Sequence, residues 1–279
     1  MAPRLSTIVG YLIALIPAYI FILAPVSRLL FGTNLRDAEN EVLDTSKIDP
    51  NLLSLVSPDE VLNCSSHSYN VHIFSRAPLV IYIESFLSDY EAEHMVHESE
   101  NNYETSQVWN GQVSEIDSSI RASENALLER DDVVKCVEDR ARNFQGWRPH
   151  LFIERMRSQR YGVSGHYVHH YDWTGASKRG DRVSTFMVYL EAKCTGGGTN
   201  FPRLKMPADK KWCEFLECGE SGGVEYEGVT FKPIKGNAVF WENLRADGSG
   251  YPETWHAGLP VLSGTKVGLN IWSWYQPGG

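Results

Sequence analysis

Short apolar and β-branched runs follow one another from about residue 150 to the C-terminal end of the chain. Glycine-rich turns separate them, and each run has the length of a single strand. The runs are Leu151–Tyr161, His166–Trp173, Arg182–Glu191, Thr199–Pro202, Val229–Lys232, Ala238–Glu242, Thr254–Ala257 and Val267–Tyr275. This pattern predicts a mainly β fold with a double-stranded β-helix (jelly roll) core, which suits a small ligand between its sheets. Arg203–Gly228 interrupts the series and is predicted to be a polar surface insertion.

Helical patterns precede this β region. Ala77–Phe86 is a dense apolar run that predicts a strand, and Ser88 then supplies an N-cap for a helix over Asp89–Ser99. Glu124–Phe144 has apolar residues at helical spacing and predicts a second helix. We expect these supporting helices to cover one face of the sheet.

The N-terminal end differs from the rest, since Leu5–Ser27 contains no charged residue. About 20 apolar residues cross a bilayer, so we predict an uncleaved transmembrane anchor in residues 1–30. A cleaved signal peptide is the alternative, although the apolar run exceeds the usual core of roughly 7–15 residues. Residues 31–75 are polar and mixed in charge, which predicts a stem, and residues 76–279 form the predicted folded domain.

The membrane orientation stays open at this point. Arg4 precedes the apolar segment and Arg28 and Arg36 follow it, a distribution that does not place the C-terminal part outside the cytosol. Asn63 begins the sequon Asn63-Cys64-Ser65, which has meaning only in the secretory lumen.

Charge and cysteine content exclude several classes of protein. A formal net charge of −9 argues against nucleic-acid binding, which needs a basic face. The five cysteines are too few for a disulfide scaffold and include no CxxC pair, so a structural zinc site is not expected. Cys213 and Cys218 are close enough to pair in an oxidising compartment and otherwise stay free.

The candidate chemistry begins with His170-Tyr171-Asp172 in one of the predicted strands. Side chains alternate faces along a strand, so His170 and Asp172 point the same way and form two-thirds of a facial triad for ferrous iron. His169 faces the other side, and His166 is four residues away, a long reach for the same ion. The alternative reading of the triplet is a pair of half-exposed polar strand residues.

Two further residues complete a candidate site. His256 lies on a late predicted strand, and ligands from distant strands converge in such folds. Lys266 directly precedes the largely apolar run Val267–Tyr275. If its ammonium pointed inward, it would need an anionic partner such as a dicarboxylate.

The arrangement of His170-x-Asp172, His256 and Lys266 resembles that of the iron- and 2-oxoglutarate-dependent dioxygenases. Within these, the chain is most similar to the prolyl 4-hydroxylase catalytic domain, over roughly Ala77 to Tyr275. The segments that carry the resemblance are Arg160-Tyr161, Gly165-x-Tyr167-x-x-His170-x-Asp172, Arg182-Val183-Ser184-Thr185 through Tyr189-Leu190, Gly196-Gly197-x-Thr199-x-Phe201-Pro202, Lys235-Gly236-Asn237-Ala238 with Phe240-Trp241-Glu242-Asn243-Leu244, and Trp255-His256-Ala257-Gly258-x-Pro260-Val261.

The resemblance implies a role for each matching residue. His170, Asp172 and His256 would ligate Fe(II), and 2-oxoglutarate would chelate the iron while its far carboxylate meets Lys266. Tyr161 and Thr199 would hydrogen-bond that carboxylate, and Trp272 would form a wall of its pocket. Tyr167 would lie beside metal and substrate, and Arg182 would contact the substrate or form a surface ion pair. Besides the metal ligands and Lys266, the predicted site residues are therefore Tyr161, Tyr167, Arg182, Thr199 and Trp272.

The same resemblance implies hydroxylation of peptidyl proline to 4-hydroxyproline with O2, release of succinate and CO2, and a requirement for L-ascorbate. Alternatives are an oxygenase of this fold acting on another residue or a small molecule, and an inactive membrane-tethered binding module. Family members with an anchor face the endoplasmic reticulum lumen, which implies a single-pass protein with a lumenal catalytic domain and favours a Cys213–Cys218 disulfide.

The chain departs from the family pattern at several positions. Ser164 stands where the family often has glycine, Val267 stands where a tryptophan usually follows the lysine, and the loop from Asp172 to Arg182 is short. These differences leave the choice of substrate the least determined part of the prediction.

Overall fold

A computed structural model describes residues 53–54, 61–109, 113–146, 151–174, 181–219 and 226–275. All of them belong to one compact unit that covers residues 46–277. The predicted anchor, residues 1–30, and most of the predicted stem lie outside the described residues. In the part of the chain that is described, no helix has both the length and the apolar character needed to cross a bilayer.

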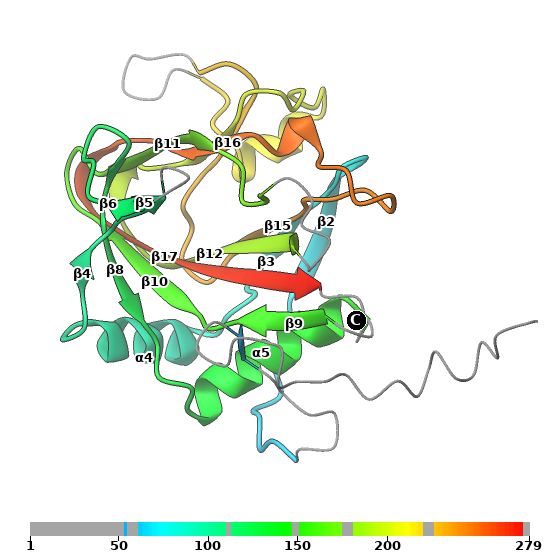
Figure 1. Cartoon of the computed structure of the whole chain (residues 1–279). Helices are drawn as coiled ribbons and strands as arrows, with labels where there is room; N and C mark the ends of the chain where they lie inside the picture. The colour runs from blue at the N-terminus through cyan, green and yellow to red at the C-terminus, as the bar shows by residue number, and fades with distance from the viewer. Residues whose placement is uncertain are drawn as a thin grey trace, which may run out of the picture. The chain divides into compact units, whose positions relative to one another are not determined.

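Two antiparallel sheets form the body of this unit (Figure 1). The larger sheet has the spatial order β2 (Asn70–Arg76), β3 (Leu79–Glu84), β15 (Ala238–Glu242), β12 (Asp181–Gly196), β17 (Val261–Tyr275), β10 (Arg157–Tyr161), β8 (Glu124–Leu127) and β4 (Glu104–Thr105). At its side, β9 (Leu151–Glu154) pairs with both β17 and β1 (Leu53–Ser54). The smaller sheet has the order β14 (Val229–Phe231), β13 (Thr199–Phe201), β16 (His256–Gly258), β11 (His166–His170) and β7 (Arg121–Ala122). A separate ribbon pairs β5 (Val108–Trp109) with β6 (Ser114–Glu115).

Among the described residues, two α-helices, α4 (Asp89–Ser99) and α5 (Asp132–Phe144), pack on the outer face of the larger sheet, below it in Figure 1. The α4 helix begins with a capping box in which Ser88 and Glu91 satisfy each other's backbone N–H groups. Asp131 caps α5 by accepting a hydrogen bond from the Val134 N–H at 2.9 Å. The predicted mainly β fold with supporting helices is confirmed, and its antiparallel sheets are consistent with the predicted jelly roll.

Strand alternation divides the apolar residues between two cores. In β12, Phe186 and Val188 face the helices, while Met187 and Tyr189 face the smaller sheet. The second core lies between the sheets and includes Phe201 of β13. The space for a ligand is therefore between the sheets, on the side away from the helices.

The predicted helix over Glu124–Phe144 is wrong in its first part. Residues Glu124–Leu127 form β8, which pairs with β10, and the helix begins only after the Asp131 cap. The short polar segment before Asp131 allowed a helical reading, but pairing with a neighbouring strand decides the structure. The predicted strand Leu151–Tyr161 is also two strands, β9 and β10, which pair with different parts of β17.

The predicted stem and insertion contain residues that belong to the fold. Strand β2 lies inside the range 31–75 except for its last residue, Arg76, and it pairs with β3 with a register shift between Ile73 and Ser75. In the insertion Arg203–Gly228, a 3-10 helix over Lys210–Glu214 leads to Phe215 and Leu216, which are buried in the second core. The insertion is therefore anchored by apolar packing rather than lying wholly on the surface.

Two disulfides occur among the described residues. The Cys213–Cys218 disulfide, left open by the sequence, is formed. A second disulfide joins Cys64 to Cys136 in α5 and was not predicted, because a sequence separation of 72 residues gave no indication of proximity. It fastens the segment ahead of β2 to the helical layer, and Cys194 is the free cysteine in the described part of the chain.

Candidate active site

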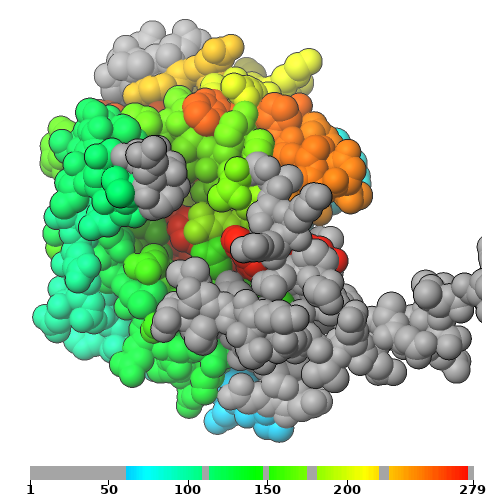
Figure 2. All heavy atoms as spheres, in the orientation of Figure 1, coloured from blue at the N-terminus to red at the C-terminus, as the bar shows by residue number. Residues whose placement is uncertain are grey.

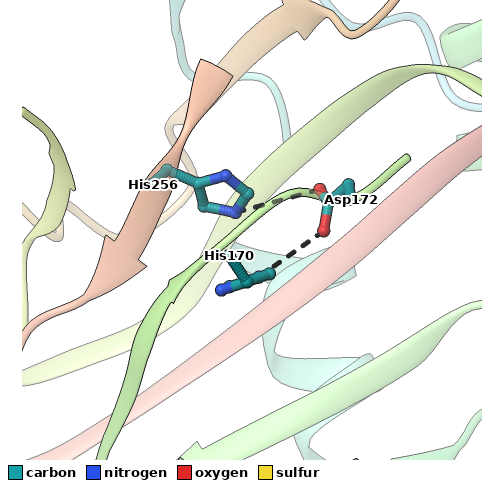
Figure 3. A group of neighbouring side chains, drawn as sticks. All are labelled: His170, Asp172 and His256. Carbon is teal, nitrogen blue, oxygen red and sulfur yellow. Dashed lines mark ion pairs between the residues drawn. The ribbon is translucent and has the colours of Figure 1, made fainter. Parts of the chain in front are cut away.

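The structure brings His170, Asp172 and His256 together in the smaller sheet. His170 ends β11 and His256 begins β16, and these residues are direct partners in the antiparallel pairing of the two strands. Asp172 lies two residues past His170, beyond the end of β11. Figure 3 shows the three side chains pointing toward one another. The Nε2 atom of His170 is 3.6 Å from Asp172 Oδ1, and that of His256 is 3.9 Å from Asp172 Oδ2.

The ligand atoms of these three side chains all lie within 4.8 Å of one another, which is the spacing of groups that share one ion. Two imidazoles and one carboxylate are the donor set of a facial triad, and that set leaves further positions on ferrous iron open. The residues present therefore fit Fe(II), the metal that the sequence predicted.

Backbone carbonyls orient both imidazoles. The Nδ1 atom of His170 is 2.8 Å from the Val168 carbonyl oxygen, and the Nδ1 atom of His256 is 2.9 Å from the Thr254 carbonyl oxygen. Because a carbonyl only accepts, Nδ1 is assigned the proton in each ring and Nε2 keeps its lone pair. This is how protein structures commonly prepare histidine for metal binding.

Burial and neighbouring charges give the triad the protonation states of metal ligands. Burial, together with the nearby charge of His170, lowers the pKa of His256 to about 4, so His256 is neutral at pH 7. Burial alone would raise the pKa of Asp172, but His256, His170 and Arg182 together hold that pKa well below its ordinary value. Asp172 is therefore ionised, as a metal ligand must be.

Lys266 supplies the charge at the other end of the site. It lies in β17 and is only 1 % exposed. Its Nζ donates to the Gly197 carbonyl oxygen at 2.6 Å and lies 4.5 Å from the centre of the Tyr161 ring. Burial lowers the pKa of Lys266 to about 8, and among the described residues no carboxylate forms an ion pair with it. A buried ammonium without a counter-charge is costly, so this end of the site is suited to an anionic group of a ligand.

A cavity joins the Lys266 end to the two histidines. Its free volume is about 30 Å³, so a five-carbon diacid enters only if lining side chains move; Met187 is a flexible one. Figure 2 shows one face of the molecule, on which atoms of the red C-terminal segment are seen between atoms of green segments. The lining residues are Tyr161, Tyr167, His170, Met187, Thr199, Trp241, His256, Gly258, Lys266 and Asn270.

Tyr161, Thr199 and Tyr167 line the cavity, and their predicted contacts with a ligand stay predictions. Thr199 is 3 % exposed, and its hydroxyl oxygen lies 2.9 Å from that of Tyr189. The Tyr167 ring stacks on His170 with 3.7 Å between ring centres, and Arg121 lies over the Tyr167 ring at 4.7 Å. Burial raises the pKa of Tyr167, so its hydroxyl stays protonated.

Arg182 and Trp272 lie together outside this lining. Two nitrogens of Arg182 bind the Glu154 carboxylate at 2.7 and 3.0 Å, and its guanidinium carbon is 3.6 Å from the centre of the Trp272 ring. Arg182 Nη1 also donates to the backbone oxygen of Asp172 at 3.4 Å. Arg182 therefore makes an ion pair, one of the two alternatives predicted, and it lies next to the triad. Trp272 is not among the residues that line the described cavity.

The neighbouring histidines are used elsewhere. His169 Nε2 is 2.9 Å from the Asn200 amide oxygen, and His166 Nδ1 is 2.9 Å from the Ser164 carbonyl oxygen. Ser164 has a φ of 65°, the left-handed region that favours glycine, which explains why the family often has glycine there. The serine keeps that backbone conformation.

Asn270 and Met187 were missed by the sequence analysis. Asn270 follows Lys266 by four residues in the same strand, so alternation places both on one face, and this signal was available. Met187 stands in a continuous apolar run in which the sequence does not distinguish the two faces. Trp241 belonged to a quoted motif without an assigned role.

Comparisons with known proteins agree with this geometry. Residues 156–274 match the model of the 2OG-Fe(II) oxygenase superfamily. The chain is 30% identical over 211 residues to "Prolyl 4-hydroxylase 5" of Arabidopsis thaliana, covering 72% of this chain and 70% of that protein. It is 29% identical over 206 residues to "Prolyl 4-hydroxylase subunit alpha-3" of Mus musculus, covering 70% of this chain and 33% of that protein.

A solved structure is similar as well. It is the viral collagen prolyl hydroxylase of Paramecium Bursaria Chlorella virus-1 in its 2OG complex, with a TM-score of 0.52 and 26% identity. The match covers 70% of this chain and 96% of that chain. The range matched by the family model, residues 156–274, contains the triad and Lys266.

Proposed function

The chain belongs to the prolyl 4-hydroxylase family of 2OG-Fe(II) oxygenases, and from this premise we propose that it hydroxylates proline in a peptide or protein substrate. This proposal rests mainly on one observation. The His170–Asp172–His256 cluster lies at a cavity that is also lined by the buried ammonium of Lys266, which has no ion-pair partner among the described residues. The "2OG complex" of the similar viral collagen prolyl hydroxylase supports 2-oxoglutarate as the diacid. Fe(II), 2-oxoglutarate and O2 are then the cofactor and cosubstrates.

Each part of the site has a distinct task in this proposal. His170, Asp172 and His256 would hold Fe(II). Lys266 neutralises the far carboxylate of 2-oxoglutarate, a charge-assisted contact that orients the diacid along the cavity. Tyr161 and Thr199, which line the same end, are proposed hydrogen-bond donors to that carboxylate.

When bound, the iron supplies the oxidative decarboxylation of 2-oxoglutarate by O2, giving succinate and CO2, and the insertion of one oxygen atom into a C–H bond. The protein's part is to position the reacting proline and exclude water. Tyr167 stacks on His170 at the cavity, and Arg182 is fixed by Glu154 beside Asp172. These two residues are proposed to contact the substrate next to the metal, and Trp272 supports the Arg182 guanidinium.

We propose that the catalytic domain lies in the lumen of the endoplasmic reticulum, with residues 1–30 as a single-pass membrane anchor and residues 31–75 partly a stem. Two disulfides in the folded unit support an oxidising compartment. Asn63 of the sequon is exposed, as a glycan acceptor must be. Glycosidase treatment of protein made in eukaryotic cells tests this: a mobility shift that Asn63→Gln abolishes is expected, and an unmodified, alkali-extractable protein would contradict it.

Mass spectrometry of proline-rich peptides incubated with protein, Fe(II), 2-oxoglutarate and L-ascorbate tests the activity. The expected product carries one added oxygen on proline and accumulates with succinate in equal amounts. His256→Ala should abolish it, whereas His169→Ala, whose ring faces Asn200 instead, should keep the metal site. L-Ascorbate is proposed as the reductant that sustains turnover. Without it, product formation should stop earlier.

Other outcomes separate the alternatives. Succinate formed only with a different residue or a small molecule would indicate an oxygenase of the same fold with another substrate. Metal binding without any succinate would indicate an inactive, tethered binding module.

A further inference from the structure

We propose that Thr185 and Asn243 are positioning residues for the iron ligand Asp172, acting through a hydrogen-bond relay that starts at the Trp241 indole. This inference rests on the proposed function, because it concerns the support of a residue assigned there to Fe(II). None of the three relay residues had a role in the sequence analysis.

The relay consists of three short hydrogen bonds. Trp241 Nε1 donates to Asn243 Oδ1 at 2.8 Å, Asn243 Nδ2 donates to Thr185 Oγ1 at 3.0 Å, and Thr185 Oγ1 donates to Asp172 Oδ2 at 2.8 Å. The exposed fractions are 1 % for Trp241, 0 % for Asn243, 1 % for Thr185 and 6 % for Asp172. Water is therefore a poor substitute for any of these partners.

The direction of every bond is set by the first donor. An indole N–H can only donate, so it fixes the amide of Asn243 with its oxygen toward Trp241 and its NH₂ group toward Thr185. The Thr185 oxygen then accepts from the amide, and its single hydrogen goes to Asp172. The relay thus always presents a donor to the carboxylate, which favours the ionised form that binds metal.

The relay also connects the two sheets. Thr185 and Trp241 are direct partners in the pairing of β12 with β15, and the Asn243 N–H donates to the Val183 carbonyl at 2.8 Å, so all three are held by the larger sheet. Asp172 instead follows β11 of the smaller sheet. The relay fixes the rotation of its carboxylate with Oδ2 toward Thr185 and Oδ1 toward His170 Nε2, 3.6 Å away.

A merely structural relay would lower stability when broken and leave metal affinity unchanged. A positioning relay changes metal affinity when it is broken, because losing a hydrogen-bond partner of a metal ligand typically lowers metal affinity by about 10- to 100-fold. The two are separated by measuring metal affinity and stability on the same variants.

The experiment is a Co(II) titration of the full chain without 2-oxoglutarate, followed by visible absorption, with Fe(II) competition as a second reading. Thr185→Val removes the hydroxyl at nearly constant volume and should weaken Co(II) binding by about 10- to 100-fold. Thr185→Ser restores the hydroxyl and should bring the affinity back to within about threefold of the unmodified chain. Asn243→Asp turns the amide donor into an acceptor, so Thr185 donates to it instead, and we expect a loss of at least about tenfold.

Ser99→Ala is the matched control. Ser99 and Ser158 are both fully buried and joined by a 2.7 Å hydrogen bond between α4 and β10, away from the triad. The thermal stability of the Ser99→Ala variant should fall, while its Co(II) affinity stays unchanged. If Thr185→Val does not fold, Asn243→Asp with the Thr185→Ser comparison decides the question.

Unchanged Co(II) affinity in the folded Thr185→Val or Asn243→Asp variants would overturn the proposed relay. An unmodified chain that binds neither Co(II) nor Fe(II) would instead contradict the proposed function. The two failures are thereby distinguished.

Discussion

At the scale of single residues, the ammonium of Lys266 bonds to a carbonyl oxygen and lies against a tyrosine ring, while no carboxylate pairs with it among the described residues. A carbonyl dipole compensates a full charge only in part. The far carboxylate of a diacid completes the compensation, so the residue provides affinity mainly when the cosubstrate is present.

Replacing this lysine tests its role. We expect Lys266→Ala to raise the KM for 2-oxoglutarate by about 10- to 100-fold, the equivalent of a hydrogen bond to a charged group of about 1.5–3 kcal/mol. Steady-state succinate formation measures this. Lys193→Ala, a change of an exposed lysine paired with Glu191, is the control and should leave KM unchanged. A normal KM in Lys266→Ala would mean that the diacid binds elsewhere.

The pH dependence of cosubstrate binding follows from the same burial. The pKa of Lys266 is lowered to about 8, so in the free protein its charge is present below pH 8 and is lost as pH rises through that value. The diacid binds the charged form, and the KM for 2-oxoglutarate should therefore increase by up to about tenfold per pH unit above pH 8. Kinetics between pH 7 and 9.5 measure it, and a flat profile would contradict it.

Strand alternation predicts the face on which a side chain lies, and this limits how much of the site could be predicted from the sequence. His170, Asp172, His256 and Lys266 could be proposed from residue type and spacing, and the structure brings the three triad residues within reach of one ion. Trp272 shows the limit: alternation gives its face, but its contact with Arg182 depends on Glu154 in another strand. Such contacts between distant strands have no local signal.

At the scale of elements, the long central strands β12 and β17 form the frame to which the site is attached. They pair over most of their length, with Thr185 opposite Trp272 and Ala192 opposite Lys266. Gly264 lies in this pairing opposite Cys194 and has a φ of 76°, which only glycine adopts without strain.

Gly264→Ala should therefore disturb the frame next to Lys266. A β-carbon at this position would collide with the backbone oxygen of Lys193. We expect a loss of about 2 kcal/mol or more in the free energy of unfolding, since the left-handed backbone alone costs about 1–2 kcal/mol. Urea denaturation measures it. Gly162→Ala has open space around the added carbon and should change stability by less than about 0.5 kcal/mol; equal effects would disprove the argument.

The elements were predicted best where the local signal was complete. Helix α4 occurs over the predicted Asp89–Ser99 because both halves of its capping box are adjacent in the sequence. Strand β8 was mistaken for helix because its partner β10 lies about 30 residues away, and strand pairing is a non-local interaction that overrides local propensity. Strand β2 was assigned to the stem for a different reason: its partner β3 follows after only Ala77 and Pro78, and this local hairpin was missed.

At the scale of the whole described unit, the Cys64–Cys136 disulfide closes the longer of the two described disulfide loops, with a sequence separation of 72. It joins an extended segment with exposed residues to α5, which packs on the larger sheet. The sequence offered no way to pair these cysteines, because Cys64 lies in a glycosylation sequon and Cys136 in a helix, and neither pattern indicates a disulfide partner.

Removing this disulfide should cost stability rather than activity. For a loop of this length, we expect the double variant Cys64→Ser with Cys136→Ser to lose about 4 kcal/mol in the free energy of unfolding. Urea denaturation under non-reducing conditions measures the loss. Cys194→Ser removes a cysteine that is free and should have a much smaller effect. A double variant as stable as the unmodified chain would show that the disulfide does not constrain the unfolded state.

Strand β17 places Lys266 and Asn270 toward the cavity and Val267, Leu269 and Ile271 toward the helices. Cosubstrate recognition and helix packing are thus encoded in alternate positions of a single ribbon. Selection for a higher working temperature and selection for a different keto acid would act on neighbouring codons of this segment. Because these positions face opposite sides of the strand, we expect heat tolerance and cosubstrate preference to be separable by single substitutions here.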